Sequence, residues 1–204
     1  MTLDSGEETG VGTSKAAARI RGAAVEMFAE RGYGTTSLRD ITSKLGLSPG
    51  AVYPHYKTKE SLLYAISLEG HTGALLAVTD GASRGVRPVD RLAHAVAAYV
   101  EWHAVHQALA RVVQYELRSL SNAHYRRIAA LRRQTTAVFT HIIEQGVGAG
   151  DFVVDDVDAV VLAISSLCID ISRWFPTRRH QDPSQIAGAY VELVTRMVVV
   201  GRGR

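Results

Sequence analysis

The stretch TTSLRDITSKLGLSPGAVYPHYKTKESLL, from Thr35 to Leu63, decides the fold, because it holds signals for two short helices and the start of a third. Ser37 is followed three residues later by Asp40, which is the spacing of a capping box at a helix start. Three apolar residues then recur on one face of that helix: Leu38, Ile41 and Leu45. Gly46 offers the left-handed backbone that ends a helix.

A second helix is predicted to begin almost at once, at Ser48 and Pro49. Serine is a favoured N-cap, and proline at the first helical position loses no hydrogen bond. Gly50 and Ala51 give this helix a bare leading face that could approach a DNA groove closely. Thr58 then caps a third helix. Two short helices joined by a tight turn predict a helix-turn-helix.

A further helix precedes this motif. Apolar residues repeat at helical spacing before the glycine-rich turn at residues 32–34, and they are Ile20, Ala24, Met27 and Phe28. The sequence therefore predicts a flexible tail at residues 1–14 and a three-helix head at residues 15–58. Downstream, residues 59–204 show helical patterns over 59–80, 88–105, 107–120, 124–147, 156–174 and 183–200. We expect an all-α protein of about nine helices.

From AAVEMFAERGYGTTSLRDIT through GLSPGAVYPHY to KTKESLL, the chain resembles the TetR-type (AcrR-like) transcriptional regulators. This resemblance covers roughly residues 16–64, under a third of the chain. It implies an N-terminal DNA-binding domain followed by a C-terminal ligand-binding and dimerisation domain. Pro54 departs from the pattern, because it stands inside the expected recognition helix and lacks the N–H that would bond to Gly50. We expect a tight turn there.

The matched positions imply a set of DNA contacts. Phosphate contacts are expected from Thr36, Ser37, Tyr53, His55 and Lys59, and from backbone N–H groups near Ser48. The residues expected nearest the base edges are Arg39, Pro49, Gly50 and Ala51. A single short recognition helix reads only a few base pairs, so two heads must meet successive major grooves. The expected partner is therefore double-stranded DNA with a palindromic operator, bound by a homodimer.

The composition is compatible with a DNA-binding protein but is not specific for one. The net charge is only +3, but all four lysines lie within the first sixty residues. A second basic cluster, Arg126, Arg127, Arg132 and Arg133, is interpreted as a solvated helix face. The sequence shows neither a signal peptide nor a membrane-spanning run, so we expect a cytoplasmic protein with no membrane partner. The lone Cys168 cannot form an intrachain disulfide and is predicted to be a buried thiol.

The last two expected helices are apolar on more than one side. The resemblance implies that they form a four-helix dimer interface, and the alternative is that they are central helices of a monomer. Middle helices supply the candidate effector contacts Trp102, His103, His106, Tyr115, Phe139 and Ile142. Arg173 and Trp174 join them, because an Arg-Trp-aromatic segment is similar to one in an acyl-coenzyme A-responsive branch of the family.

The effector is thus expected to be a small hydrophobic molecule, with an acyl-CoA thioester as first candidate and a drug-like compound as alternative. We find no nucleophile elbow, phosphate loop or metal-ligand spacing, so no catalytic site, metal or cofactor is expected. A rival interpretation is an all-helical dimeric interaction protein that lacks specific DNA binding, which Pro54 could indicate.

Overall fold

The structure is a computed structural model that describes residues 14–199. The expected tail therefore lies outside the described residues, apart from Ser14. The described chain contains eight α-helices and two 3-10 helices, and no strand. In chain order they are α1 (Lys15–Arg31), α2 (Leu38–Lys44), η1 (Pro49–Val52), α3 (Lys59–Ser83), α4 (Pro88–Val105), α5 (Gln107–Tyr115), η2 (Leu117–Ser119), α6 (Asn122–Ala149), α7 (Val157–Trp174) and α8 (Pro183–Val198). The all-α prediction is confirmed.

The helix starts follow the predicted capping chemistry. Ser37 accepts a hydrogen bond from the backbone N–H of Asp40, and the Asp40 carboxylate accepts from the N–H of Ser37, which completes a capping box. The hydrogen bonds that the Asp40 carboxylate accepts from the hydroxyl and the backbone N–H of Ser37 hold the pKa of Asp40 below its usual range. Thr58 and Ser61 form a second capping box at the start of α3. Both boxes satisfy N–H groups that a helix start leaves without partners.

The expected recognition helix is shorter than the sequence pattern implies. Only the 3-10 turn η1 forms, and it ends two residues before Pro54. The N–H groups of His55 and Tyr56 both donate to the carbonyl oxygen of Val52, at 3.0 and 2.9 Å, so the chain turns instead of extending a helix. Proline has no N–H to continue the ladder, which explains the early end. The tight turn expected at Pro54 is confirmed.

The body differs from the predicted pattern mainly in one segment. The helix expected over 107–120 ends at Tyr115 and continues as the short turn η2. By contrast, α4 has the predicted bounds, and α6 is longer than predicted because Ser121 caps it two residues earlier than expected. The C-terminal end of α6 stops at Gly150, whose φ of 75° is the left-handed conformation that favours glycine.

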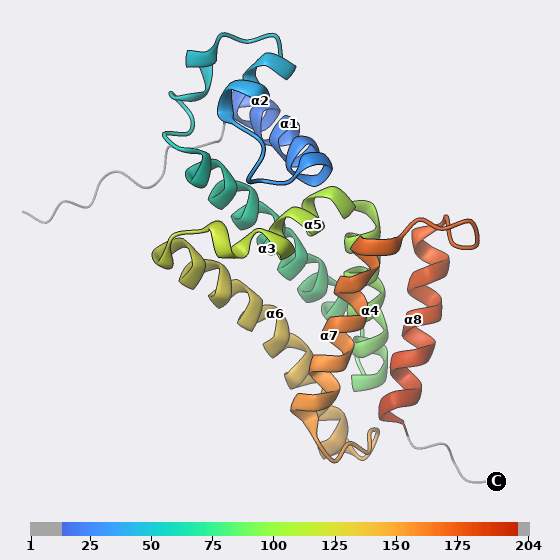
Figure 1. Cartoon of the computed structure of the whole chain (residues 1–204). Helices are drawn as coiled ribbons and strands as arrows, with labels where there is room; N and C mark the ends of the chain where they lie inside the picture. The colour runs from blue at the N-terminus through green and yellow to red at the C-terminus, as the bar shows by residue number, and fades with distance from the viewer. Residues whose placement is uncertain (1–13, 200–204) are drawn as a thin grey trace, which may run out of the picture.

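Two apolar cores hold the molecule together. One lies in the body among α3, α4, α6, α7 and α8, and it includes the buried ring of Phe139. The other is built mainly from α1, α2, η1 and the start of α3, but Val112, Val113, Leu120 and Ile128 of the body also belong to it. Figure 1 shows α3 running from the head down into the body, with α5 crossing beneath the head. Head and body thus share a continuous apolar contact.

One described helix, α3, is long and apolar enough by length and composition to cross a membrane, with a mean hydropathy of 1.2. Several of its apolar side chains are buried in the two cores of the folded protein. Leu62, Leu63 and Ile66 lie in the head core, and Val78 lies in the body core. The apolar character of α3 is therefore accounted for by its position between the two cores.

Candidate DNA interface and effector cavity

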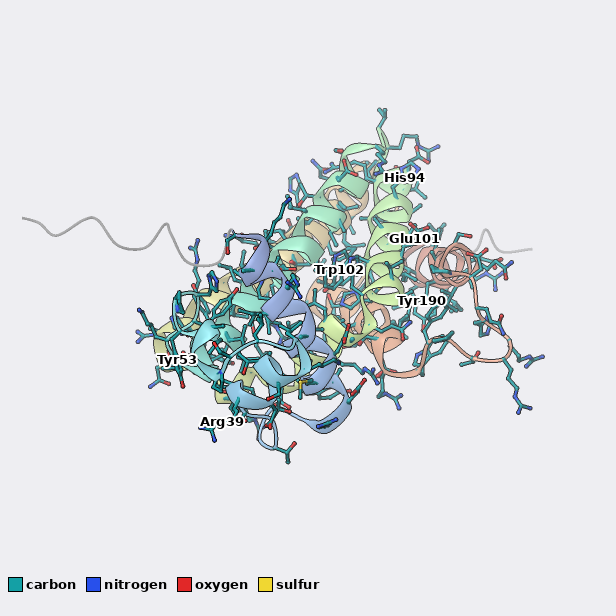
Figure 2. The ribbon with its side chains drawn as sticks, turned by 90° about the horizontal axis from the view of Figure 1, so that it is seen from above. Arg39, Tyr53, His94, Glu101, Trp102 and Tyr190 are labelled. Atoms are coloured by element: carbon teal, nitrogen blue, oxygen red, sulfur yellow. The ribbon has the colours of Figure 1, made fainter. Side chains whose placement is uncertain are left out.

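The head presents two large side chains to solvent at its outer side. Arg39 projects from α2, and Tyr53 follows η1 with 51% of its surface exposed. Figure 2 shows both on the far side of the head from His94 on α4 and Tyr190 on α8. An arginine fork and a phenol on one exposed surface can reach base edges and phosphates respectively.

The residues around η1 are also accessible. Ser48, Pro49 and Gly50 are exposed, whereas Ala51 and His55 are half-buried. Ser48 makes no side-chain cap, so its hydroxyl is not used by the turn. The buried members of this segment are Val52 and Tyr56, which pack inward as the spacing predicts. Small exposed residues here allow the backbone to approach a surface closely.

Three predicted phosphate contacts have other partners in the structure. Thr36 is only 2% exposed, and its hydroxyl donates to the carbonyl oxygen of Gly32 at 2.9 Å. The Thr36 side chain is therefore not part of the candidate interface. Ser37 is exposed but serves the capping box. The ammonium of Lys59 donates to the carbonyl oxygens of Tyr33 and Thr36, at 2.8 and 2.9 Å, and lies 4.2 Å from the Tyr33 ring centroid.

The main role of Lys59 is thus structural, because its hydrogen bonds join the start of α3 to the head. It joins the first residue of α3 to the turn between α1 and α2, and only one of its three N–H groups remains for a phosphate. This role could not be predicted from the residue types, because Tyr33 and Thr36 contribute backbone oxygens, which every residue carries.

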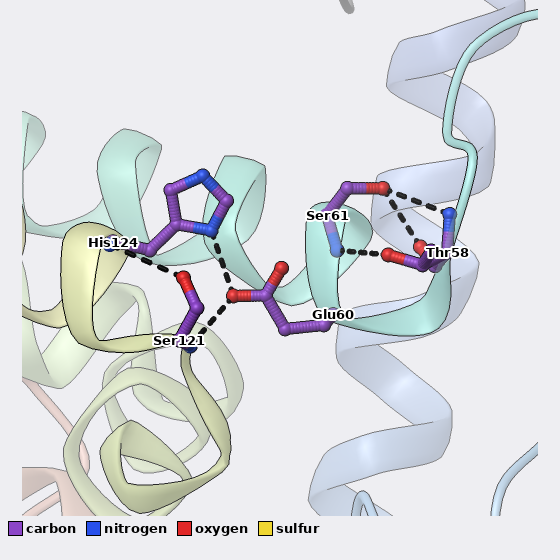
Figure 3. A network of polar contacts seen from close by, with 5 residues as sticks. All are labelled: Thr58, Glu60, Ser61, Ser121 and His124. Atoms are coloured by element: carbon purple, nitrogen blue, oxygen red, sulfur yellow. Dashed lines mark hydrogen bonds and ion pairs between the residues drawn. The ribbon is translucent and has the colours of Figure 1, made fainter.

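A polar network links the head to the body where α3 meets α6 (Figure 3). A carboxylate oxygen of Glu60 lies 2.7 Å from Nδ1 of His124 and accepts from the backbone N–H of Ser121 at 2.8 Å. Burial raises the pKa of Glu60, but these hydrogen bonds outweigh it and leave the pKa lowered. The His124 ring also stacks on Tyr64, with centroids 3.7 Å apart.

The body contains a cavity of about 410 Å³ between α3, α4, α5, α6 and α7. This volume lies within the range of small-molecule sites. Three predicted effector residues line it: Trp102, His103 and Tyr115. They are joined by apolar groups such as Val113 and Leu162, and by hydroxyl groups from Thr135, Thr136, Ser165, Ser166 and Ser172.

Two histidines in the cavity wall, the buried His103 and the half-buried His71, are kept neutral. Burial is the main cause that lowers the pKa of His71 to about 4, and the positive charge of Arg132 adds to it. Burial likewise lowers the pKa of His103 to about 4. Nδ1 of His103 lies 2.8 Å from the carbonyl oxygen of Tyr99, so it carries the proton, and Nε2 is an acceptor. Nε2 of His71 is buried without a hydrogen-bond partner.

The other predicted effector residues lie outside this cavity lining. Phe139 and Ile142 are fully buried in the body core. His106 caps the end of α4 and stacks on the Trp102 ring at a centroid distance of 5.0 Å. Arg173 forms two hydrogen bonds to Asp170, at 2.8 and 2.9 Å, and Trp174 packs against Phe175 and His180.

Sequence reasoning missed His71, Gln114 and Arg132 in the cavity wall. Arg132 belongs to the basic cluster interpreted as a solvated helix face, and the other three arginines of that cluster are indeed exposed. Arg132 alone is half-buried, because it points toward Gln114 on α5, whose side-chain oxygen lies 3.3 Å away. A local sequence signal was the apolar Leu131 next to it, which the structure packs on the head core.

Large apolar side chains are exposed along α7 and α8. They are Leu162, Leu167, Leu193 and Met197, with Leu162 68% exposed and Leu193 50% exposed. The buried stripe of each helix faces the body core, as Ile164 and Val194 show. The surplus apolar character predicted for these two helices therefore lies on the molecular surface.

Comparisons with known proteins agree with this architecture. Residues 20–66 match the family described as bacterial regulatory proteins, tetR family, and residues 85–198 match the tetracyclin repressor-like C-terminal domain. A tetR-family regulatory protein from Rhodococcus RHA1 has a solved structure that superimposes with a TM-score of 0.89. It is 60% identical and covers 93% of this chain and 100% of that chain.

Two more distant relatives are the regulators KstR2 and AibR. The transcriptional repressor KstR2 of Mycobacterium tuberculosis is 29% identical over 174 residues, which are 84% of this chain and 86% of KstR2. AibR, solved in complex with isovaleryl coenzyme A and operator DNA, has the same fold, with a TM-score of 0.79 and 20% identity over 88% of this chain and 97% of that chain. Family matches over both parts of the chain and a 60% identical relative lead to one conclusion. The chain belongs to the TetR family of bacterial transcriptional regulators.

Proposed function

We propose that this protein is a cytoplasmic repressor that binds a palindromic operator as a homodimer and releases it when a small effector enters the body cavity. In this proposal, residues 15–58 form the DNA-binding head and residues 59–204 bind the effector and dimerise. The observation that carries it is the joint presence of an exposed Arg39–Tyr53 surface on the head and a cavity in the body.

The DNA contacts follow from the exposed residues of the head. Arg39 and the small residues at Pro49, Gly50 and Ala51 are placed toward base edges, and Ser37, Ser48, Tyr53 and His55 toward phosphates. Because η1 is a single turn, few side chains reach the bases. Specificity then depends on Arg39 together with the shape of the DNA.

Dimerisation is proposed through α7 and α8. Leu167, Leu193 and Met197 are exposed apolar side chains on these two helices, and burying such side chains supplies the driving force for association. A homodimer sets two copies of the head at a fixed spacing, about 34 Å for successive major grooves. The operator would then repeat the symmetry of the protein.

The effector is proposed to contact Trp102, His103 and Tyr115, with an apolar part against Val113 and Leu162. AibR shows that this fold can hold an acyl-coenzyme A, and an acyl-CoA thioester of lipid or branched-acid catabolism is our first candidate. A cavity of about 410 Å³ suits the acyl group better than a whole thioester. A drug-like hydrophobic compound is the alternative effector.

The test is fluorescence-polarisation binding to the DNA upstream of the gene for this protein, with a scrambled duplex as control. We expect salt-dependent binding that the scrambled duplex does not share and that one effector class releases. Specific binding that neither acyl-CoA thioesters nor drug-like compounds release would retain the repressor and overturn the effector assignment. Equal affinity for both duplexes would overturn the repressor and favour an interaction protein.

A further inference from the structure

Arg132 lies between two cavities of the body. One is the cavity of about 410 Å³ described above, and the other, of about 370 Å³, also has Arg132 in its lining. Arg132 and Thr136 line both cavities, so the two cavities adjoin at these side chains. The second cavity is bordered mainly by α6, with Leu117 of η2 opposite.

The charge of Arg132 is not neutralised within the described chain. None of its nitrogens lies within 4.0 Å of a carboxylate in residues 14–199, and the hydrogen bond to Gln114 is long, at 3.3 Å. The side chain is nevertheless half-buried. A partly desolvated guanidinium without an anionic partner is unfavourable, and such groups usually contact a counter-charge. Arg132 therefore has the properties of a group that binds an anion.

The two cavities differ in charge. Asp158 and Asp170 border the first cavity, and its two histidines are neutral. The second cavity is bordered by Arg132 and Arg133 and by no acidic residue. Arg133 is exposed and makes no ion pair among the described residues, and Tyr125 belongs to the same lining. An anion is thus favoured on the second side of Arg132.

We propose that the effector is an amphipathic anion whose apolar part occupies the first cavity and whose anionic group binds Arg132 and Arg133 in the second. This inference rests on the proposed function, because it assigns the orientation of the effector in that cavity. Arginine binds carboxylates and phosphates by the same two-pronged hydrogen bonding. The anion is therefore a carboxylate of a free acid or a phosphate of a nucleotide thioester.

The experiment is isothermal titration calorimetry on the full-length protein with three matched probes. Hexanoate carries a carboxylate, hexanoyl-coenzyme A carries phosphates, and S-hexanoyl-N-acetylcysteamine is a neutral thioester. Each is titrated into the wild type, Arg132→Gln, Arg133→Gln and the control Arg127→Gln. Arg127 is exposed on the same helix and borders neither cavity.

We expect one of the two anionic probes to bind, and Arg132→Gln to weaken it about 10- to 100-fold while Arg127→Gln does not. The probe that binds identifies the anion as carboxylate or phosphate. Three outcomes would overturn the inference: no binding of either anion, equal binding of the neutral thioester, or equal losses in Arg132→Gln and Arg127→Gln.

A thermal-unfolding measurement without ligand separates binding from folding. Because the charge of Arg132 is uncompensated, Arg132→Gln is expected to melt at or above the temperature of Arg127→Gln. A clearly lower melting temperature would assign Arg132 a structural role and contradict the inference. Operator binding is measured in parallel, so that a failure of the proposed DNA function is recognised independently of the Arg132 result.

Discussion

Glu60 and His124 are sixty-four residues apart in sequence, yet their side chains meet at 2.7 Å where the first turn of α3 lies against the start of α6. Glu60 follows directly after the head, and His124 lies two turns before Arg132 on the same helix. The two residues therefore form a direct polar connection between the start of α3, which follows the DNA-binding head, and the helix that borders both cavities.

This pair is expected to stabilise the fold measurably. Glu60→Gln and His124→Ala should each lower the free energy of unfolding, and the double variant should show a coupling of about 1 kcal/mol, typical of a partly buried hydrogen-bonded pair. Urea denaturation of the four proteins measures it. His141→Ala, an exposed histidine on the same helix, is the control and should show no coupling with Glu60→Gln.

The head variants should separate DNA binding from folding. Arg39→Ala is expected to weaken operator binding by about 1–3 kcal/mol with little change in stability, because its side chain is exposed. Lys59→Ala should instead lower the free energy of unfolding, since its ammonium ties Tyr33 and Thr36 to α3. Fluorescence polarisation and denaturation are measured on both. An unchanged stability of Lys59→Ala would disagree with its role as a structural tie.

Disrupting the exposed apolar surface should produce a monomer. Leu193→Glu places a charge on α8 within the proposed interface, so sedimentation velocity is expected to show half the wild-type mass. Leu76→Glu is the matched control, because Leu76 on α3 is similarly exposed, at 62%, and lies outside that surface. Equal behaviour of the two variants would remove α8 from the interface.

Stability should fall as the pH is lowered from 7 to 5. The folded-state pKa values of His71 and His103, about 4, lie below the ordinary 6.5. Below pH 6.5 the unfolded chain therefore binds protons that the folded chain excludes. Each histidine should cost about 2 kcal/mol at pH 5 relative to pH 8. His71→Gln should reduce this loss by that amount in urea titrations, whereas the exposed His141→Gln should not.

Two glycines of α6 should respond oppositely to alanine. A Cβ at Gly146 would lie 1.9 Å from the Phe152 ring, whereas one at Gly148 meets nothing within 4 Å. Gly146→Ala is therefore expected to destabilise the protein by about 1–3 kcal/mol, and Gly148→Ala to stabilise it by up to about 1 kcal/mol. Thermal denaturation distinguishes them, and a stable Gly146→Ala would show that Phe152 can move away easily.

The helices and their capping boxes were predictable because local chemistry determines them. Ser37, Thr58 and the proline-started helices at Pro88 and Pro183 mark boundaries within a few residues of those observed. The early end of the expected recognition helix, which forms only the turn η1, was indicated in the sequence by Pro54 alone. The cavity wall was less predictable, because whether a helical residue faces core, cavity or solvent depends on how helices distant in sequence pack. Phe139 and Trp102 look alike in pattern, yet only Trp102 borders the cavity.

The apolar contact between head and body also limits how this protein can be re-engineered. Val112, Val113, Leu120 and Ile128 complete the core of the head although they belong to the body. A hybrid regulator that joins this head to a foreign sensor domain at Thr58 would leave that core open on one side. A transplantable unit must bring Leu62, Leu63 and Ile66 with it and meet a matching apolar patch on its new host.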